Sequence, residues 1–168
     1  MSLHQQLLQR ESEGRPIRVG LIGAGKFGAM YVAQIPRTPG VHLAGIADLD
    51  VPGARANLER VGWPEERHCA ASLDDALELG TTFVSEDWQA LVRHPAIDVI
   101  VECTGHPVAA VDHCLEAFAH GKHVVNVTVE ADAFCGPALA QRAAKAGVVY
   151  SLAFGDQPAL ICDLVDWA

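Results

Sequence analysis

The sequence contains no apolar run long enough to cross a membrane. Charged or polar residues interrupt each hydrophobic stretch before it reaches the ~20 residues that a spanning helix needs. Its first residues, MSLHQQLLQRESEG, lack the basic start, apolar middle and small-residue cleavage site of a secretory signal. Positive charge is also scarce, with 12 Lys and Arg against 21 Asp and Glu and a net charge of −9. We therefore expect a cytoplasmic protein that binds neither a membrane nor nucleic acid.

Cysteine is present, but not in a pattern that binds metal. The five cysteines include no CxxC pair and no zinc-ligand spacing. An odd, scattered set is typical of a reducing compartment, where disulfides are rare. We expect no metal site, and a chain of 168 residues, half of them hydrophobic, is long enough to form the core of one domain.

Short apolar runs alternate with helical stretches from Ile17 onward. Runs that are apolar on both faces are typical of a parallel sheet that helices cover on both sides. We predict an α/β fold of the Rossmann type, with a doubly wound, mainly parallel sheet of about six strands. The predicted strands are IRVGLIG (17–23), VHLAGIAD (41–48), TTFVS (81–85), AIDVIVECTG (96–105), KHVVNVT (122–128) and VVYSLAFG (148–155).

The segment GAGKFG follows the first predicted strand and opens a helix. Its glycines have the GxGxxG spacing, in which the first permits a tight turn, the second lets a pyrophosphate approach the backbone, and the third lets the helix pack on the strand. An acid ends the second strand about 20 residues later, where a ribose-binding carboxylate is expected. We predict a dinucleotide site that contains Gly23, Ala24, Gly25, Lys26, Phe27, Gly28 and Asp48.

The choice between NAD and NADP stays open at this stage. Asp48 can accept hydrogen bonds from ribose hydroxyls and repels a 2′-phosphate, which favours NAD, and Asp50 adds negative charge. Arg55 on the following helix could turn toward a 2′-phosphate.

The fourth strand ends in a second polar turn, VIVECTGHP. Ligands of open α/β sheets bind at the carboxyl ends of strands, so we expect Thr104, Gly105 and His106 to face the cofactor. His106 is either a donor to a carbonyl or phosphate, or a residue of the surface. Glu102, inside the apolar run, is either a buried acid bonded to backbone N–H groups or a catalytic group. His113, on the next helix, is predicted to be structural or solvated, since no carboxylate lies at metal-ligand spacing from it.

Five segments together resemble the cofactor domain of the homoserine-dehydrogenase-like oxidoreductases: GLIGAGKFG, ADLD, VIVECTG, GKHVVNVTVEAD and AAKAGVVYSLAFGDQPAL. Within that family the chain looks most like the branch of 1-deoxy-D-xylulose 5-phosphate reductoisomerase-like proteins that carry a C-terminal SAF domain. Homoserine dehydrogenases usually have a lysine soon after the GKHVV-type strand. This chain has Glu130 and Ala131 there, so the substrate-loop chemistry of that family is not carried over.

The resemblance implies reduction of a small, often phosphorylated carbonyl compound, commonly with NADPH, so the cofactor is expected to be NADP or NAD. It also implies that Gly155 and Pro158 approach the nicotinamide, with a hinge into a further domain as the alternative.

We divide the chain into an N-terminal helical arm (1–16), an NAD(P)-binding Rossmann domain (17–155) and the start of a helix (156–168) that leads into a substrate domain. The expected function is hydride transfer between nicotinamide and the carbonyl or alcohol of a small polar substrate, with the catalytic acid and base beyond this chain. The alternative is an NAD(H)-binding regulatory or sensing module without catalysis. Apolar stripes in the first and last segments favour a homo-oligomer.

Overall fold

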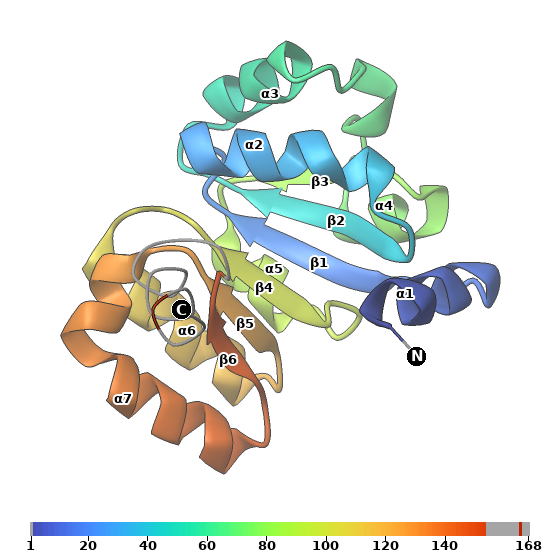
Figure 1. Cartoon of the computed structure of the whole chain (residues 1–168). Helices are drawn as coiled ribbons and strands as arrows, with labels where there is room; N and C mark the ends of the chain where they lie inside the picture. Colours follow the sequence, from blue (N-terminus) through green and yellow to red (C-terminus); the bar gives the residue numbers. More distant parts are fainter. Residues whose placement is uncertain (1, 154–164, 166–168) are drawn as a thin grey trace.

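A parallel sheet of six strands forms the centre of the computed structural model, which describes residues 2–153 and residue 165 (Figure 1). The strand order is β3-β2-β1-β4-β5-β6, so the direction of winding reverses between β1 and β4. The predicted Rossmann-type α/β fold is thereby confirmed. Gly155, Pro158 and the predicted helix from residue 156 lie outside the described residues. The strands are β1 (Ile17–Ile22), β2 (Val41–Ala47), β3 (Phe83–Ser85), β4 (Val99–Glu102), β5 (His123–Asn126) and β6 (Tyr150–Leu152).

Helices cover both faces of the sheet. One core cluster joins α2 and α3 to β1, β2 and β3, and a second joins α4, α5, α6 and α7 to the opposite face. In Figure 1, α2 and α3 accordingly lie together over the β2–β3 end of the sheet. The helices are α1 (Leu3–Ser12), α2 (Lys26–Gln34), α3 (Val51–Arg60), α4 (Leu73–Leu79), α5 (Trp88–Arg93), α6 (Pro107–Ala119) and α7 (Val129–Ala146), with 3₁₀ turns at Ile35–Arg37 and Glu65–Arg67.

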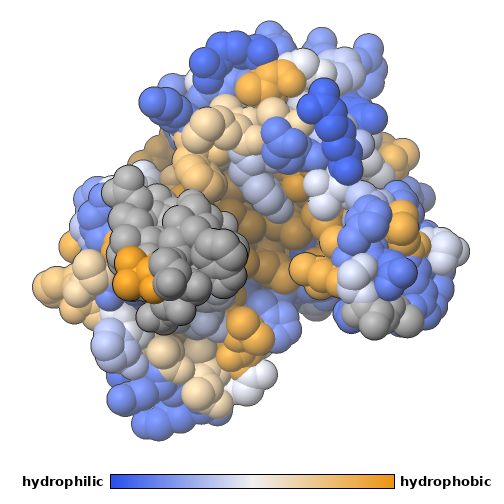
Figure 2. All heavy atoms as spheres, in the orientation of Figure 1, coloured by the Kyte–Doolittle hydropathy of each residue, from blue (hydrophilic) through white to orange (hydrophobic). Residues whose placement is uncertain are grey.

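The face that carries α2 and α3 is covered unequally. Val99, Val125 and Val127 pack at the edge of its core cluster and are only half-buried. Figure 2 shows hydrophobic residues in a hollow at the middle of this side of the molecule, with hydrophilic residues around it. The two halves of the sheet are therefore not equally covered within the described part of the chain.

Helices α1 and α7 have distinctive local features. Ser2 caps α1, which lies within the N-terminal arm predicted at 1–16 and buries none of its residues. Helix α7 starts at Val129 and kinks at Cys135, two residues before Pro137. Among the described residues, no helix is both long and apolar enough to span a bilayer.

Lys122 ties the loop before β4 to the start of β5. Its Nζ is buried and donates to the carbonyl oxygens of His94 at 2.8 Å and Ile97 at 2.7 Å. Since Lys122→Met keeps the apolar stem but leaves these carbonyls without a donor, we expect the free energy of unfolding to fall by about 2 kcal/mol. Urea unfolding followed by tryptophan fluorescence measures this, with the exposed Lys145→Met as control. If Lys122→Met lost no more unfolding free energy than Lys145→Met, the hydrogen bonds of Lys122 would not stabilise the fold.

Candidate functional site

A cavity of about 470 Å³ opens at the carboxyl ends of the strands, where the winding of the sheet reverses. The ends of β1, β2 and β4, the loop after β3 and one face of α6 all contribute to it. This is the edge at which doubly wound sheets bind ligands. Its lining consists of Ile22, Gly23, Gly25, Ala47, Asp48, Leu49, Glu86, Trp88, Cys103, Thr104, His106, Ala109 and His113.

The glycine-rich turn between β1 and α2 forms one wall. Gly23 has a φ of +95°, and a Cβ there would lie 2.8 Å from the carbonyl oxygen of Cys103. A Cβ on Gly28 would collide with the carbonyl oxygen of Gly23. Gly25 differs, because its φ of −68° is not in the left-handed region and no atom of residues 2–153 beyond its chain neighbours lies within 4 Å of a Cβ built on it. The fold itself thus requires the first and third glycines, whereas the second leaves open space in the cavity.

Asp48 is held in place by the backbone on both of its oxygens. Oδ2 accepts from the Ala24 N–H at 2.7 Å, and Oδ1 accepts from the Asp50 N–H at 2.9 Å. Asn57 of α3 donates to the Ala24 carbonyl at 2.9 Å and so fixes the same turn from the other side. Because a carboxylate offers about four acceptor positions, two remain for hydroxyl groups of a ligand.

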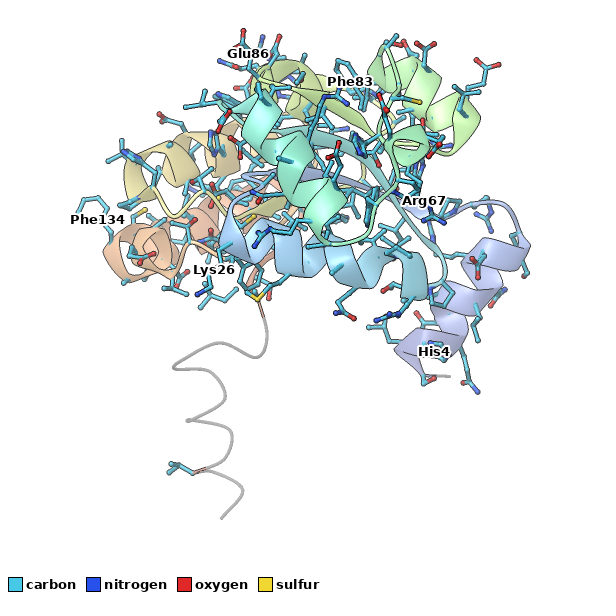
Figure 3. The ribbon with its side chains drawn as sticks, turned by 90° about the horizontal axis from the view of Figure 1, so that it is seen from above. His4, Lys26, Arg67, Phe83, Glu86 and Phe134 are labelled. Carbon is cyan, nitrogen blue, oxygen red and sulfur yellow. The ribbon has the colours of Figure 1, made fainter. Side chains whose placement is uncertain are left out.

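The charged groups around Asp48 are mostly negative. Glu86 lines the same cavity, and Asp50 caps α3 beside it. Arg55, the candidate partner of a 2′-phosphate, instead donates through Nη1 to the His68 carbonyl at 2.6 Å. Figure 3 shows Lys26 at the start of α2, on the opposite side of the ribbon from Glu86. In this structure Arg55, which could turn toward a 2′-phosphate, is therefore bonded to His68 instead.

Glu102 lies fully buried behind the cavity and organises the turn after β4. Oε1 of Glu102 accepts from the Thr104 hydroxyl at 2.6 Å and from the Thr104 N–H at 3.3 Å. Oε2 of Glu102 accepts from the Thr128 hydroxyl. Thr128 in turn accepts from the Gly105 N–H at 3.0 Å. Burial raises the pKa of Glu102, but hydrogen bonds from His113, Thr104 and Thr128 outweigh it and hold the pKa below its usual value. The buried-acid interpretation is thus supported, although most of its donors are side chains.

His106 and Cys103 also face this turn. His106 is the N-cap of α6, and its Nδ1 accepts from the Ala109 N–H at 3.2 Å. Cys103 donates from Sγ to the Gly23 carbonyl at 2.8 Å, and burial raises the pKa of its thiol far above the usual range. Cys103 therefore stays protonated and ties β4 to the glycine-rich turn.

The structure brings together only some of the predicted residues. Gly23, Gly25, Asp48, Thr104 and His106 line the cavity. The remaining described ones stand next to it or support its turns: Ala24, Lys26, Phe27, Gly28 and Gly105.

Sequence reasoning missed Glu86, Trp88 and His113 as lining residues, and none of them belongs to a known motif. The position of Glu86 directly after β3 is a signal that could have identified it, because ligands bind at the carboxyl ends of the strands. No cluster of metal-ligating side chains occurs in residues 2–153 or at residue 165.

Several solved structures share the fold of this chain. A homoserine dehydrogenase from Thiobacillus denitrificans superposes with a TM-score of 0.65 at 23% identity, covering 82% of this chain and 29% of that one. An NAD binding oxidoreductase from Klebsiella pneumoniae gives a TM-score of 0.57 at 22% identity, with 90% and 39% covered. Biliverdin reductase from Synechocystis, solved with biliverdin and NADP⁺, gives 0.54 at 20% identity, with 82% and 37% covered.

The sequence comparisons identify the family. No curated protein matches the chain. The family model described as the NAD binding domain of homoserine dehydrogenase matches residues 23–152, from the glycine-rich turn to the end of β6. The chain spans about a third of the length of the solved structures that it resembles. The chain belongs to the family of homoserine dehydrogenase NAD-binding domains and is an NAD(P)-binding domain of the oxidoreductase type.

Proposed function

We propose that the cavity binds NAD(H) in preference to NADP(H), and that the whole protein uses it to transfer hydride to or from the carbonyl carbon of a small polar substrate. The observation that carries the proposal is the open space at Gly25. No described residue would contact a side chain at position 25, so the missing side chain leaves room for a ligand. When bound, the nicotinamide supplies or accepts the hydride.

Different residues of the cavity would bind different parts of the dinucleotide. The first N–H groups of α2 have no partners within the helix and, with the helix dipole, would hold the pyrophosphate next to Gly25. The two free acceptor positions of Asp48 would receive the ribose hydroxyls. Thr104 and His106 close the cavity at the end of β4.

The preference for NAD(H) follows from charge. A 2′-phosphate would meet Asp48 with Glu86 on the same cavity wall, while Arg55 is bonded to His68. Repulsion between groups that lie partly in protein exceeds that in water, and about 1.4 kcal/mol of it corresponds to tenfold in affinity. We therefore propose that this protein uses NAD(H), although the sequence resemblance implies that NADPH is common among its relatives.

The chemistry on the substrate is assigned to the whole protein. Cys103, which lines the cavity, is protonated, and the carboxylate of Glu102 behind the cavity is fully buried and bonded to three residues. Neither group is free to exchange a proton with a substrate carbonyl. We expect the 168-residue chain to bind dinucleotide and to show little or no turnover.

Calorimetric titration of the chain with NADH and with NADPH tests the proposal. We expect NADH to bind at least about tenfold more tightly, and Asp48→Asn to reduce that ratio toward one, since it removes the charge but keeps an acceptor. Asp112→Asn, exposed on α6, is the matched control and leaves the ratio unchanged. Tighter binding of NADPH would overturn the preference, and binding of neither dinucleotide would overturn the proposed function.

A further inference from the structure

Two histidines on one face of α6 line the cavity, and the first has a defined proton position. His106, Ala109 and His113 follow one another at helical spacing and all contribute to the lining. Nδ1 of His106 accepts the Ala109 N–H and so carries no proton. In the neutral ring the proton is therefore on Nε2, which makes His106 a hydrogen-bond donor.

His113 has the opposite arrangement. Its Nδ1 lies 3.2 Å from Oε1 of Glu102, a carboxylate that is only an acceptor when ionised. The proton of the neutral ring is thus on Nδ1, and Nε2 is an acceptor. Trp88 packs edge-on against the ring with centroids 4.4 Å apart, which holds its orientation. The side chain is buried, with 7% of it exposed, and Nε2 has no hydrogen-bond partner among residues 2–153.

One ring nitrogen that donates and one that accepts correspond in kind to the polar groups of adenine. The base presents an amino group that donates, next to ring nitrogens that accept. His113 and Trp88 share the cavity with Asp48, the residue assigned to the adenosine ribose, so the base falls on their side of the site. Ala109 lies between the two histidines on the helix and leaves room with its single methyl group.

We propose that His113, oriented by Glu102, accepts a hydrogen bond from the amino group of adenine, and that His106 donates to a ring nitrogen of the same base. The inference presupposes the dinucleotide binding proposed above and adds recognition of the base. Glu102 is then a positioning residue, because it acts on the ligand only through the ring of His113 and the turn at Thr104.

Nicotinamide hypoxanthine dinucleotide is the probe, because it differs from NAD⁺ only at the base. Hypoxanthine carries an oxygen in place of the amino group, so an acceptor would face the lone pair of His113. We expect NAD⁺ to bind the 168-residue chain on the order of tenfold more tightly than this analogue. Calorimetric titration of both ligands under one set of conditions gives the ratio.

Two variants separate base recognition from a structural role. His113→Phe keeps a ring against Trp88 but removes the acceptor, and we expect it to bring the ratio near one. His120→Phe, exposed at the end of α6, is the control and keeps the wild-type ratio. Any loss of stability shared by both ligands cancels from this ratio.

The outcomes distinguish the inference from the proposed function. A wild-type ratio of one, with NAD⁺ bound, overturns the recognition of adenine while dinucleotide binding stands. The same ratio is expected if the two histidines contact the nicotinamide carboxamide, because both ligands carry it. Binding of neither ligand overturns the proposed function. The wild-type ratio needs no variant, so it tests the inference even where His113→Phe does not fold.

Discussion

Replacing Gly25 with alanine is expected to weaken NADH binding about 100-fold, while the free energy of unfolding changes by at most about 1 kcal/mol. The added Cβ meets no atom of the described part of the chain within 4 Å, and the φ of −68° is open to alanine. The stability cost is limited to the weaker N-cap of α2. The binding cost is larger, because the methyl group enters the space assigned to the pyrophosphate.

Gly28→Ala provides the contrasting variant. Its Cβ collides with the carbonyl oxygen of Gly23, a backbone atom that cannot turn away. We expect this variant to lose several kcal/mol of stability, on the order of 3 kcal/mol, as overpacked sites do. Calorimetry for binding and thermal unfolding for stability separate the two glycines. Equal NADH affinity in Gly25→Ala and wild type would show that no ligand uses the open space.

The fold and the centre of the site could be predicted because their signals are local. Alternating apolar runs specify a parallel sheet, and the glycine spacing with Asp48 lies within one strand–helix–strand unit. Gly25 shows the limit of that reasoning. The spacing alone cannot tell which glycines the fold requires, whereas the structure shows that the surrounding backbone already requires Gly23 and Gly28.

The partners of the buried groups could not be predicted from spacing. His113 shows no sequence relation to a carboxylate, yet α6 packs back on the sheet and places its Nδ1 beside Glu102. Trp88 reaches the same place from α5, after a separate strand. Arg55 is a further case, because its place in the sequence leaves a turn toward a 2′-phosphate open, whereas in the structure it donates to the His68 carbonyl. Side-chain orientation across packed elements decides each case.

Glu102→Gln is expected to lower the free energy of unfolding by about 3 kcal/mol at pH 7. The buried carboxylate accepts from Thr104, Thr128 and His113, all of which lie at the turn that closes the cavity. The amide keeps one acceptor oxygen but places a donor where Oε2 receives the Thr128 hydroxyl. The substitution therefore removes the negative charge and also the hydrogen bond that Oε2 accepts from the Thr128 hydroxyl.

The same variant makes the pH dependence of stability testable. The pKa of Glu102 lies below its usual value in the folded protein, so the folded state binds this proton less readily than the unfolded chain. Its stabilisation is complete above the unfolded pKa of about 4.3 and is lost as the pH falls through the folded pKa. The difference in unfolding free energy between wild type and Glu102→Gln should thus be largest near neutral pH and shrink below about pH 4.

Urea unfolding at several pH values measures that difference, with Glu78→Gln, an exposed carboxylate on α4, as the matched control for loss of one charge. A difference that grows on acidification would mean that Glu102 is protonated in the folded protein. His113 would then lack the anion that fixes its proton on Nδ1, and its acceptor nitrogen would no longer face the cavity. The pH dependence of unfolding in wild type and Glu102→Gln therefore tests, without any dinucleotide, whether Glu102 is ionised and can fix the proton of His113 on Nδ1.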